Sequence, residues 1–272
     1  MNRKLLVTFF VTYLAFLGLT NLNAEASELS LTEEEKHYLH EVLELSEQEV
    51  SNIPIEEAKF LVENEAVVVN KFTETFDMTD AGPIENPREI TPRGTISSND
   101  LTFKGVILKL STSAVSGYDA FHAYVDYDWI NKPMWRLTDK ISIGFPTSLG
   151  VYLQTSNGKI QGHYGSHWVY NTQTKGKTTY ASTSTPSDSD PSAGVASSVN
   201  LHGTISVNDR LQGHVSQTYY VQTSKSGNAN VKFEYGHKLI SGSPSVSIIP
   251  SGLGISATGN IDTKAYYASF SY

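Results

Sequence analysis

The sequence of 272 residues contains no cysteine. This absence excludes disulfide bonds, thiolate catalysis and a lipid anchor attached to a cysteine. Stability must therefore come from an ordinary hydrophobic core. The length left after any targeting segment suits one sizeable domain and a small appendage.

The sequence also lacks the short motifs of common enzymes. No serine lies in a G-x-S-x-G motif, no HExxH pair is present, and no glycine-rich phosphate loop occurs. The sequence has no clustered run of basic residues, so nucleic acid is not an expected partner. A non-enzymatic protein is therefore the leading expectation, and no catalytic residue is assigned. A hydrolase that uses paired carboxylates or histidines stays open as an alternative.

One long hydrophobic run is present, at the N-terminus. Arg3 and Lys4 precede a mostly apolar stretch at 5–19, and Ala24-Glu25-Ala26 follows it. The run is shorter than the ~20 residues of a membrane-spanning helix. This pattern predicts a secretory signal peptide cleaved after Ala26, and therefore a secreted, extracellular protein.

Charge divides the remaining chain into two parts. Residues 27–92 hold 17 acidic and 4 basic residues, whereas residues 93–272 hold 10 acidic and 14 basic residues. Such asymmetry favours two functional units. The predicted organisation is a signal peptide at 1–26, an acidic helical leader at 27–76, a linker at 77–94 and a β domain at 95–272.

The acidic leader has the signals of short helices. Apolar residues recur at helical spacing over 38–45 and 55–69. Two capping boxes begin the helices, Thr32 with Glu35 and Ser46 with Glu49. The simplest interpretation is a small helical hairpin with a solvated acidic exterior. The alternative is a removable pro-segment, because Arg88 and Arg93 lie in a proline-rich linker open to trypsin-like cleavage.

From residue 95 onward, apolar residues alternate with polar ones. The pattern over 121–129 places Phe121, Val125 and Trp129 on one face, which predicts that Trp129 is a core residue. Similar stretches recur, separated by Gly, Ser, Asn and Pro. They predict a mainly β fold, an antiparallel β-sandwich or jelly-roll-like domain preceded by a small α-helical segment. Residues 182–198 are rich in Ser, Pro and Asp, and are expected to form a loop.

Two segments, LELSEQEVSNIPIEEAKFLVENEA and YDWINKPMWRLTDKISIGF, resemble uncharacterised secreted proteins of Gram-positive bacteria. Those proteins likewise join a signal peptide and an acidic helical leader to a β-rich C-terminal domain. The resemblance implies the same architecture and an extracellular location. It implies no activity and no site residue.

An aromatic turn after residue 129 is the main candidate for ligand binding. Trp135 and Arg136 follow a proline, and could stack on a sugar ring or contact a partner surface. Tyr127 and Trp168 complete the predicted binding set, with a cell-envelope glycan or a surface protein as the partner. The alternative is that Trp135 only covers one end of the sandwich.

Metal binding is a weaker candidate, and the default expectation is no cofactor. His163 and His167 lie four apart, on one face of a predicted strand, as zinc ligands could. Asp126, Asp128 and Asn131 carry oxygen atoms of the kind that bind calcium.

Residues 241–263 alternate small polar with apolar residues, as membrane-inserting strands do. Pro250, Gly252 and Gly254 interrupt the pattern, so an ordinary extracellular sheet explains it too. The leading function is therefore a secreted sandwich protein that binds an extracellular surface or ligand. A pore-forming, toxin-like protein is the first alternative, and only that reading requires a membrane.

Overall fold

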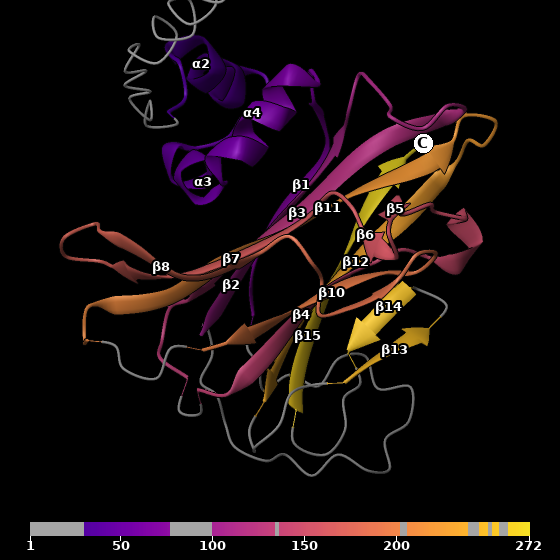
Figure 1. Ribbon diagram of the computed structural model, residues 1–272. Helices are drawn as coiled ribbons and strands as arrows, with labels where there is room; N and C mark the ends of the chain where they lie inside the picture. The colour runs from indigo at the N-terminus through magenta and orange to yellow at the C-terminus, as the bar shows by residue number, and fades with distance from the viewer. Residues whose placement is uncertain are drawn as a thin grey trace, which may run out of the picture.

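The computed structural model describes residues 30–76, 100–133, 136–201, 206–238, 245–249, 252–255 and 261–272. Two antiparallel sheets form most of it (Figure 1). The six-stranded sheet has the order β1 (Val67–Phe76), β2 (Leu101–Lys109), β3 (Tyr118–Trp129), β11 (Asp209–Gln222), β7 (His163–Asn171) and β8 (Lys177–Thr183). The five-stranded sheet has the order β15 (Ile261–Ser271), β12 (Asn228–Lys238), β4 (Thr138–Gly144), β10 (Gly194–Asn200) and β9 (Asp188–Asp190).

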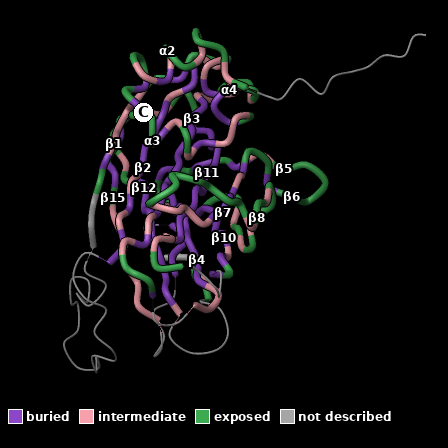
Figure 2. Tube along the Cα trace, turned by 90° about the vertical axis from the view of Figure 1, so that its left-hand side faces the viewer, coloured by how far each residue is buried: buried purple, intermediate pink, exposed green. Residues whose placement is uncertain are grey.

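The two sheets pack face to face around the main hydrophobic core, which runs through the centre of the molecule in Figure 2. Alternate residues of each strand point into it because side chains alternate along a strand. Trp129 is among them, as predicted. The structure thus confirms a mainly β, antiparallel, sandwich-like fold with a short N-terminal helical segment. Core residues from the strands of both sheets include Phe121, Val125, Val215, Tyr219, Ile141, Ile143, Phe233 and Tyr235.

The prediction of a loop at 182–198 is wrong. This stretch contains the end of β8, all of β9 and most of β10. Val195 and Val199 enter the main core, and a Cβ on Gly194 would lie 2.2 Å from the carbonyl oxygen of Ile143. Close strand packing therefore requires glycine at 194, and the abundance of Ser, Pro and Asp did not indicate a loop.

The helical segment consists of α2 (Glu33–Glu41), α3 (Glu47–Asn52) and α4 (Ile55–Glu63), and both predicted capping boxes are present. The helices cover the outer face of the six-stranded sheet (Figure 1). None of the described helices is long and apolar enough to cross a bilayer. A second hydrophobic cluster joins helices and sheet, and includes Leu39, Leu43, Ala58, Leu61, Val106, Leu108, Tyr124 and Tyr220.

The apolar pattern expected to continue as helix to residue 69 ends earlier. Helix α4 stops at Glu63, and Glu65 turns the chain with a φ of 45°. The valines at 67–69 then enter β1, because β-branched residues favour strands. Strand β1 pairs with β2 from Val67 to Phe76, so the end of the predicted leader is a strand of the sheet. The predicted signal peptide and linker lie outside the described residues.

Two short hairpins complete the fold: β5 (Thr155–Ser156) with β6 (Lys159–Ile160), and β13 (Val246–Ile249) with β14 (Gly252–Ile255). The β13–β14 hairpin lies on the outer face of the five-stranded sheet, where β14 contacts β4, β10 and β12 (Figure 1). In sequence it is inserted between β12 and β15, which pair directly with each other. This insertion, and the helices on the opposite face, position the candidate sites.

Candidate functional site

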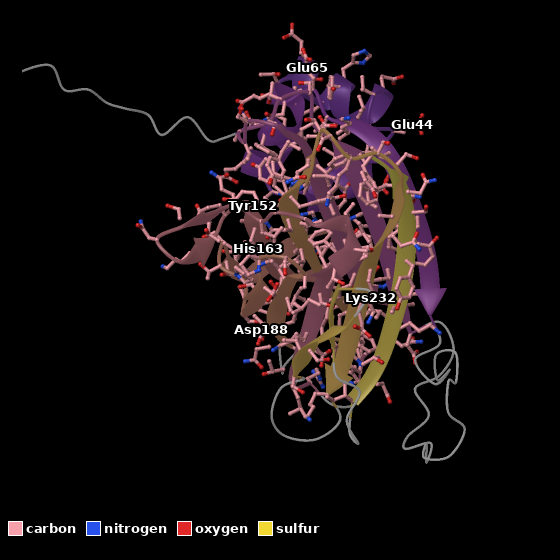
Figure 3. The ribbon with its side chains drawn as sticks, turned by 90° about the vertical axis from the view of Figure 1, so that its right-hand side faces the viewer. Glu44, Glu65, Tyr152, His163, Asp188 and Lys232 are labelled. Atoms are coloured by element: carbon pink, nitrogen blue, oxygen red, sulfur yellow. The ribbon has the colours of Figure 1, made fainter. Side chains whose placement is uncertain are left out.

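The β13–β14 hairpin covers a polar surface. On β4 and β12, the residues that alternate with core residues point away from the main core, toward the hairpin. They are Lys140, Ser142, Lys232 and Glu234, exposed by only 5%, 0%, 4% and 5% (Lys232 is labelled in Figure 3). Charged residues are rarely buried so fully, because removing them from water is costly.

Backbone N–H groups of β14 hold the hairpin on this surface. The Ile255 N–H donates to Glu234 Oε2 at 2.7 Å, and Lys232 Nζ donates to the same oxygen at 2.7 Å. The Leu253 N–H donates to the Ala193 carbonyl at 2.8 Å. The buried Ser142 hydroxyl has no hydrogen-bond partner within the described part of the chain. Lys140 Nζ pairs with the Asp188 carboxylate of β9. The charges beneath the hairpin are thus paired, whereas the Ser142 hydroxyl is not.

Two glycines let the hairpin approach the sheet closely. A Cβ on Gly144 would lie 2.4 Å from the Leu253 carbonyl oxygen, and a Cβ on Gly236 would lie 2.7 Å from Ile255 Cγ2. Leu253 and Ile255 are consequently buried, at 3% and 6% exposure. The hairpin is therefore docked by its apolar side chains on a face that is otherwise polar.

The hairpin has two chemically different sides. Val246 pairs with Ile255, whereas Ser247 pairs with Gly254 and Ile249 with Gly252. Directly paired residues of an antiparallel ladder share one face. Val246, Leu253 and Ile255 thus share one apolar face, whereas Ser247, Gly252 and Gly254 share the other, with Ile249 at its end beside the turn.

A buried polar cluster fixes the end of β12, directly before the inserted segment. The His237 ring contacts the Asp139 carboxylate through Nδ1 at 2.9 Å, and the Lys238 N–H donates to the same carboxylate at 2.9 Å. The Tyr235 hydroxyl donates to it at 2.7 Å and accepts from Trp129 Nε1–H at 2.9 Å. Burial raises the pKa of Asp139. The strand is therefore anchored up to Lys238.

A second polar cluster lies beneath α4, on the outer face of the six-stranded sheet. Glu57 Oε1 lies 2.9 Å from His122 Nε2 and 3.0 Å from His214 Nε2, and Glu57 Oε2 accepts from Ser216 Oγ at 2.8 Å. The other ring nitrogen of His214 lies 2.7 Å from Asp126 Oδ1. All five residues are buried.

Paired charges set the pKa values of this cluster. Burial alone would lower the pKa of His214, but the carboxylates of Glu57 and Asp126 outweigh burial and raise that pKa to about 10. Burial alone would raise the pKa of Glu57, but His214 and His122 outweigh it and hold that pKa well below its usual range. His214 is therefore an imidazolium between two carboxylates at neutral pH.

We expect this cluster to stabilise the fold less at alkaline pH. Because folding raises the pKa of His214, its contribution is complete below the ordinary value of 6.5 and is lost as pH rises toward about 10. Because folding lowers the pKa of Glu57, its contribution is complete above 4.5 and is lost in acid. Between about pH 6 and about pH 9.5, the urea midpoint should fall more for the wild type than for Glu57→Gln. Other groups that titrate in this range contribute equally to both proteins, so the comparison removes their effect. Lys177 is one of them, because burial lowers its pKa to about 8. Equal falls in both proteins would contradict the assignment.

The predicted ligand-binding residues do not form one exposed site. Trp135 lies outside the described residues. Tyr127 and Trp168 are buried, at 2% and 0% exposure, so neither offers a surface to a ligand. Trp168 Nε1–H donates to Gln212 at 2.9 Å, and Lys177 Nζ lies 3.7 Å from its ring centroid. Arg136 is half-buried near one end of the sandwich.

The predicted metal ligands make other contacts. His163 and His167 share the inner face of β7, where His163 Nε2 lies 2.8 Å from Ser197 Oγ and His167 Nδ1 lies 3.3 Å from the Tyr127 hydroxyl. Burial lowers both histidine pKa values to about 4. Within the described ranges, no three His, Cys, Asp or Glu side chains group as metal ligands.

The three predicted calcium ligands are likewise engaged elsewhere. Asp126 contacts His214, Asp128 Oδ2 accepts from Arg210 at 3.1 Å, and Asn131 Nδ2 donates to Asp100 at 2.7 Å. Their side chains therefore serve structural pairs rather than one common centre.

A hollow of about 300 Å³ lies on the outer surface near the ends of β12 and β15. Tyr267, which is 48% exposed, and Tyr272 line it together with Asn228 and Asn230. The Asn228 side-chain oxygen Oδ1 accepts from Ser271 Oγ at 2.7 Å, which orients the side-chain amide. The hollow thus combines aromatic rings with amide groups.

No family model matches the sequence, and no curated protein matches it. A solved structure described as "Pore forming protein" is 8% identical, covers 73% of this chain and 90% of its own, and aligns with a TM-score of 0.31. A likeness at that level establishes neither fold nor function.

Proposed function

We propose that this protein is a membrane-active, pore-forming protein whose inserting segment is the stretch between β12 and β15, residues 239–260. One observation carries the proposal: the apolar face of the β13–β14 hairpin is docked on a charged face of the sheet. Each surface has the chemistry of a different environment, water for the sheet and lipid for the hairpin.

Release of the hairpin would return the sheet surface to water. Lys140, Lys232 and Glu234 would be rehydrated, which recovers much of the cost of burying them. The main core would stay intact, because its residues lie on the other side of β4 and β12. Release would also expose the apolar side chains of Leu253 and Ile255 to water, at a cost in free energy. Insertion into a bilayer would bury them again.

The inserted segment has the length and pattern of a membrane-spanning strand pair. Two arms, 239–249 and 252–260, have 11 and 9 residues, close to the ~9–11 that cross a bilayer as tilted strands. No charged residue occurs between Lys238 and Asp262. In an extended hairpin, one face would carry Ile240, Gly242, Pro244, Val246, Ile248, Leu253, Ile255, Ala257 and Gly259. The other would carry Ser241, Ser243, Ser245, Ser247, Gly252, Gly254, Ser256, Thr258 and Asn260, with Leu239 and Ile249 at the ends of the first arm.

A single inserted hairpin would leave unpaired backbone groups at its edges, at a high cost in lipid. Several copies must therefore pair their hairpins into a closed ring, with the serine-rich face toward a water-filled channel. The predicted signal peptide at 1–26 suits a protein that reaches membranes from outside the producing cell.

Dye release from liposomes tests the proposal. The purified protein should release an encapsulated dye and form detergent-resistant oligomers, and truncation of residues 241–258 should remove both properties while the circular-dichroism spectrum stays β-rich. A protein that stays monomeric and leaves liposomes intact would refute membrane insertion.

We also propose that the protein attaches to a glycan-bearing surface through the hollow at Tyr267. A sugar ring presents C–H groups that pack on an aromatic face, and hydroxyls that amides such as those of Asn228 and Asn230 can bind. This keeps the glycan partner expected from the sequence, but moves the site away from Trp135.

We expect Tyr267→Ala to weaken retention on glycan arrays or cell walls roughly tenfold, because the lost aromatic contact is worth about 1–2 kcal/mol. Tyr152→Ala, at a 37% exposed tyrosine outside the hollow, is the matched control. Equal retention by both variants would remove the hollow from consideration.

A further inference from the structure

The Glu57 carboxylate is bound as a ligand would be. Its two oxygens face three donors, His122, His214 and Ser216, at 2.8 to 3.0 Å. The donors come from neighbouring strands of the six-stranded sheet, whereas the carboxylate comes from α4, a separate element. The sheet supplies the binding groups and the helix supplies the bound group.

The sheet orients these donors without help from the helix. His122 pairs directly with Thr218, and its Nδ1 lies 2.9 Å from Thr218 Oγ1. His214 pairs directly with Asp126, and its Nδ1 lies 2.7 Å from Asp126 Oδ1. In both pairs the cross-strand contact occupies Nδ1 and leaves Nε2 directed at α4. The site is therefore preformed by strand register.

The chemistry of the site selects a carboxylate. His214 has a carboxylate at each ring nitrogen, so it carries both protons and a positive charge. A planar, singly charged group with two acceptor oxygens satisfies both histidines through one oxygen and Ser216 through the other. A neutral amide could accept from both histidines and donate to the Ser216 hydroxyl, but it would bring no negative charge to pair with the His214 imidazolium.

We infer that the outer face of the six-stranded sheet carries a carboxylate-binding site, formed by His122, His214 and Ser216, whose built-in ligand is Glu57. In the intact chain this contact secures α4 on the sheet, beside the apolar contacts of Ala58 and Leu61. When the Glu57 carboxylate is absent, the site accepts a small carboxylate from solution. This inference is independent of membrane insertion.

Chemical rescue tests the site. Glu57→Ala removes the bound group and leaves space for acetate or formate beside the three donors. We expect this variant to melt at lower temperature than the wild type, and acetate to restore part of the loss in a saturable manner, with a dissociation constant on the order of millimolar because the ligand has so few atoms. Chloride and sulfate at the same ionic strength should not restore it.

Matched variants make the test specific. Glu56→Ala, at the exposed neighbouring position, should melt like the wild type and show no acetate effect. Glu57→Gln fills the same space and should not be rescued. The inference would be overturned if acetate raised the melting temperature of Glu57→Ala by no more than it raises that of the wild type.

A second measurement covers the case in which Glu57→Ala does not fold. Ser216→Ala removes one donor and keeps the carboxylate. We expect amide hydrogen exchange in α4 to accelerate roughly tenfold, while exchange in β4 of the opposite sheet stays unchanged. Unchanged exchange in α4 would also overturn the inference. Neither the acetate assay nor the hydrogen-exchange assay contains a membrane. Their results therefore test the carboxylate site whether or not the protein forms pores.

Discussion

A disulfide between Gly236→Cys and Ile255→Cys is expected to reduce dye release to the level of liposomes alone. The ideal Cβ position of Gly236 lies 3.6 Å from Ile255 Cβ, within the usual range of about 3.5–4.5 Å for a disulfide. The bond would tie β14 to β12 and prevent the hairpin from leaving the sheet. Because the chain has no cysteine, no other disulfide can form within it.

Reduction provides the control within one protein. After treatment with dithiothreitol, the double variant should release dye again, and the single variant Ile255→Cys should be active under both conditions. Bilayer binding should survive in the oxidised form if attachment uses another surface. Wild-type dye release by the fully oxidised variant would show that the hairpin need not move.

Phe72→Ala is expected to lower the free energy of unfolding by about 3–5 kcal/mol, the usual cost of truncating a buried phenylalanine. The Phe72 ring is 6% exposed, stacks on Tyr266 at 3.9 Å between centroids, and lies over Gly105, where a Cβ would be 2.1 Å from the ring. It thus fills the core between the two sheets, although it lies within the predicted leader. Thermal unfolding should show a drop of roughly 10 °C for a chain of this size.

The matched control is Val67→Ala, in the same strand but 48% exposed, which should change stability by less than about 0.5 kcal/mol. If residues 30–76 were a separable leader, Phe72→Ala would loosen the helices and leave the main transition of the sandwich in place. A single transition shifted to lower temperature is the result expected for a strand integral to the sheet.

The parts of the fold that depend on local pattern could be predicted from the sequence. The alternation of apolar and polar residues predicts β3 and the inward orientation of Trp129. The spacing of a hydroxyl residue and a glutamate three positions later predicts where α2 and α3 begin. The parts that depend on distant contacts could not. The sequence places β1 in the leader because residues 67–69 also fit a helical stripe, and only pairing with β2 decides between helix and strand.

The candidate sites show the same division. The alternation at 241–263 is visible in the sequence, but the charged surface beneath it requires β4 and β12 to be placed side by side. The carboxylate site joins residues 65 to 159 positions apart. Its one sequence signal was Glu57 itself, an acid beside Ala58 and four positions before Leu61, on the buried side of a helix that has exposed acids elsewhere.

The direct pairing of β12 with β15 bears on how quickly an inserting hairpin could form. Bringing the ends of a 22-residue segment together normally costs loop-closure entropy before any strand contact forms. Here Lys238 and Ile261 are already partners, so folding in water has closed the loop in advance. In the proposed insertion, extension into lipid would then proceed one residue pair at a time from the existing β12–β15 ladder, and that ladder would set the register of the new pairs.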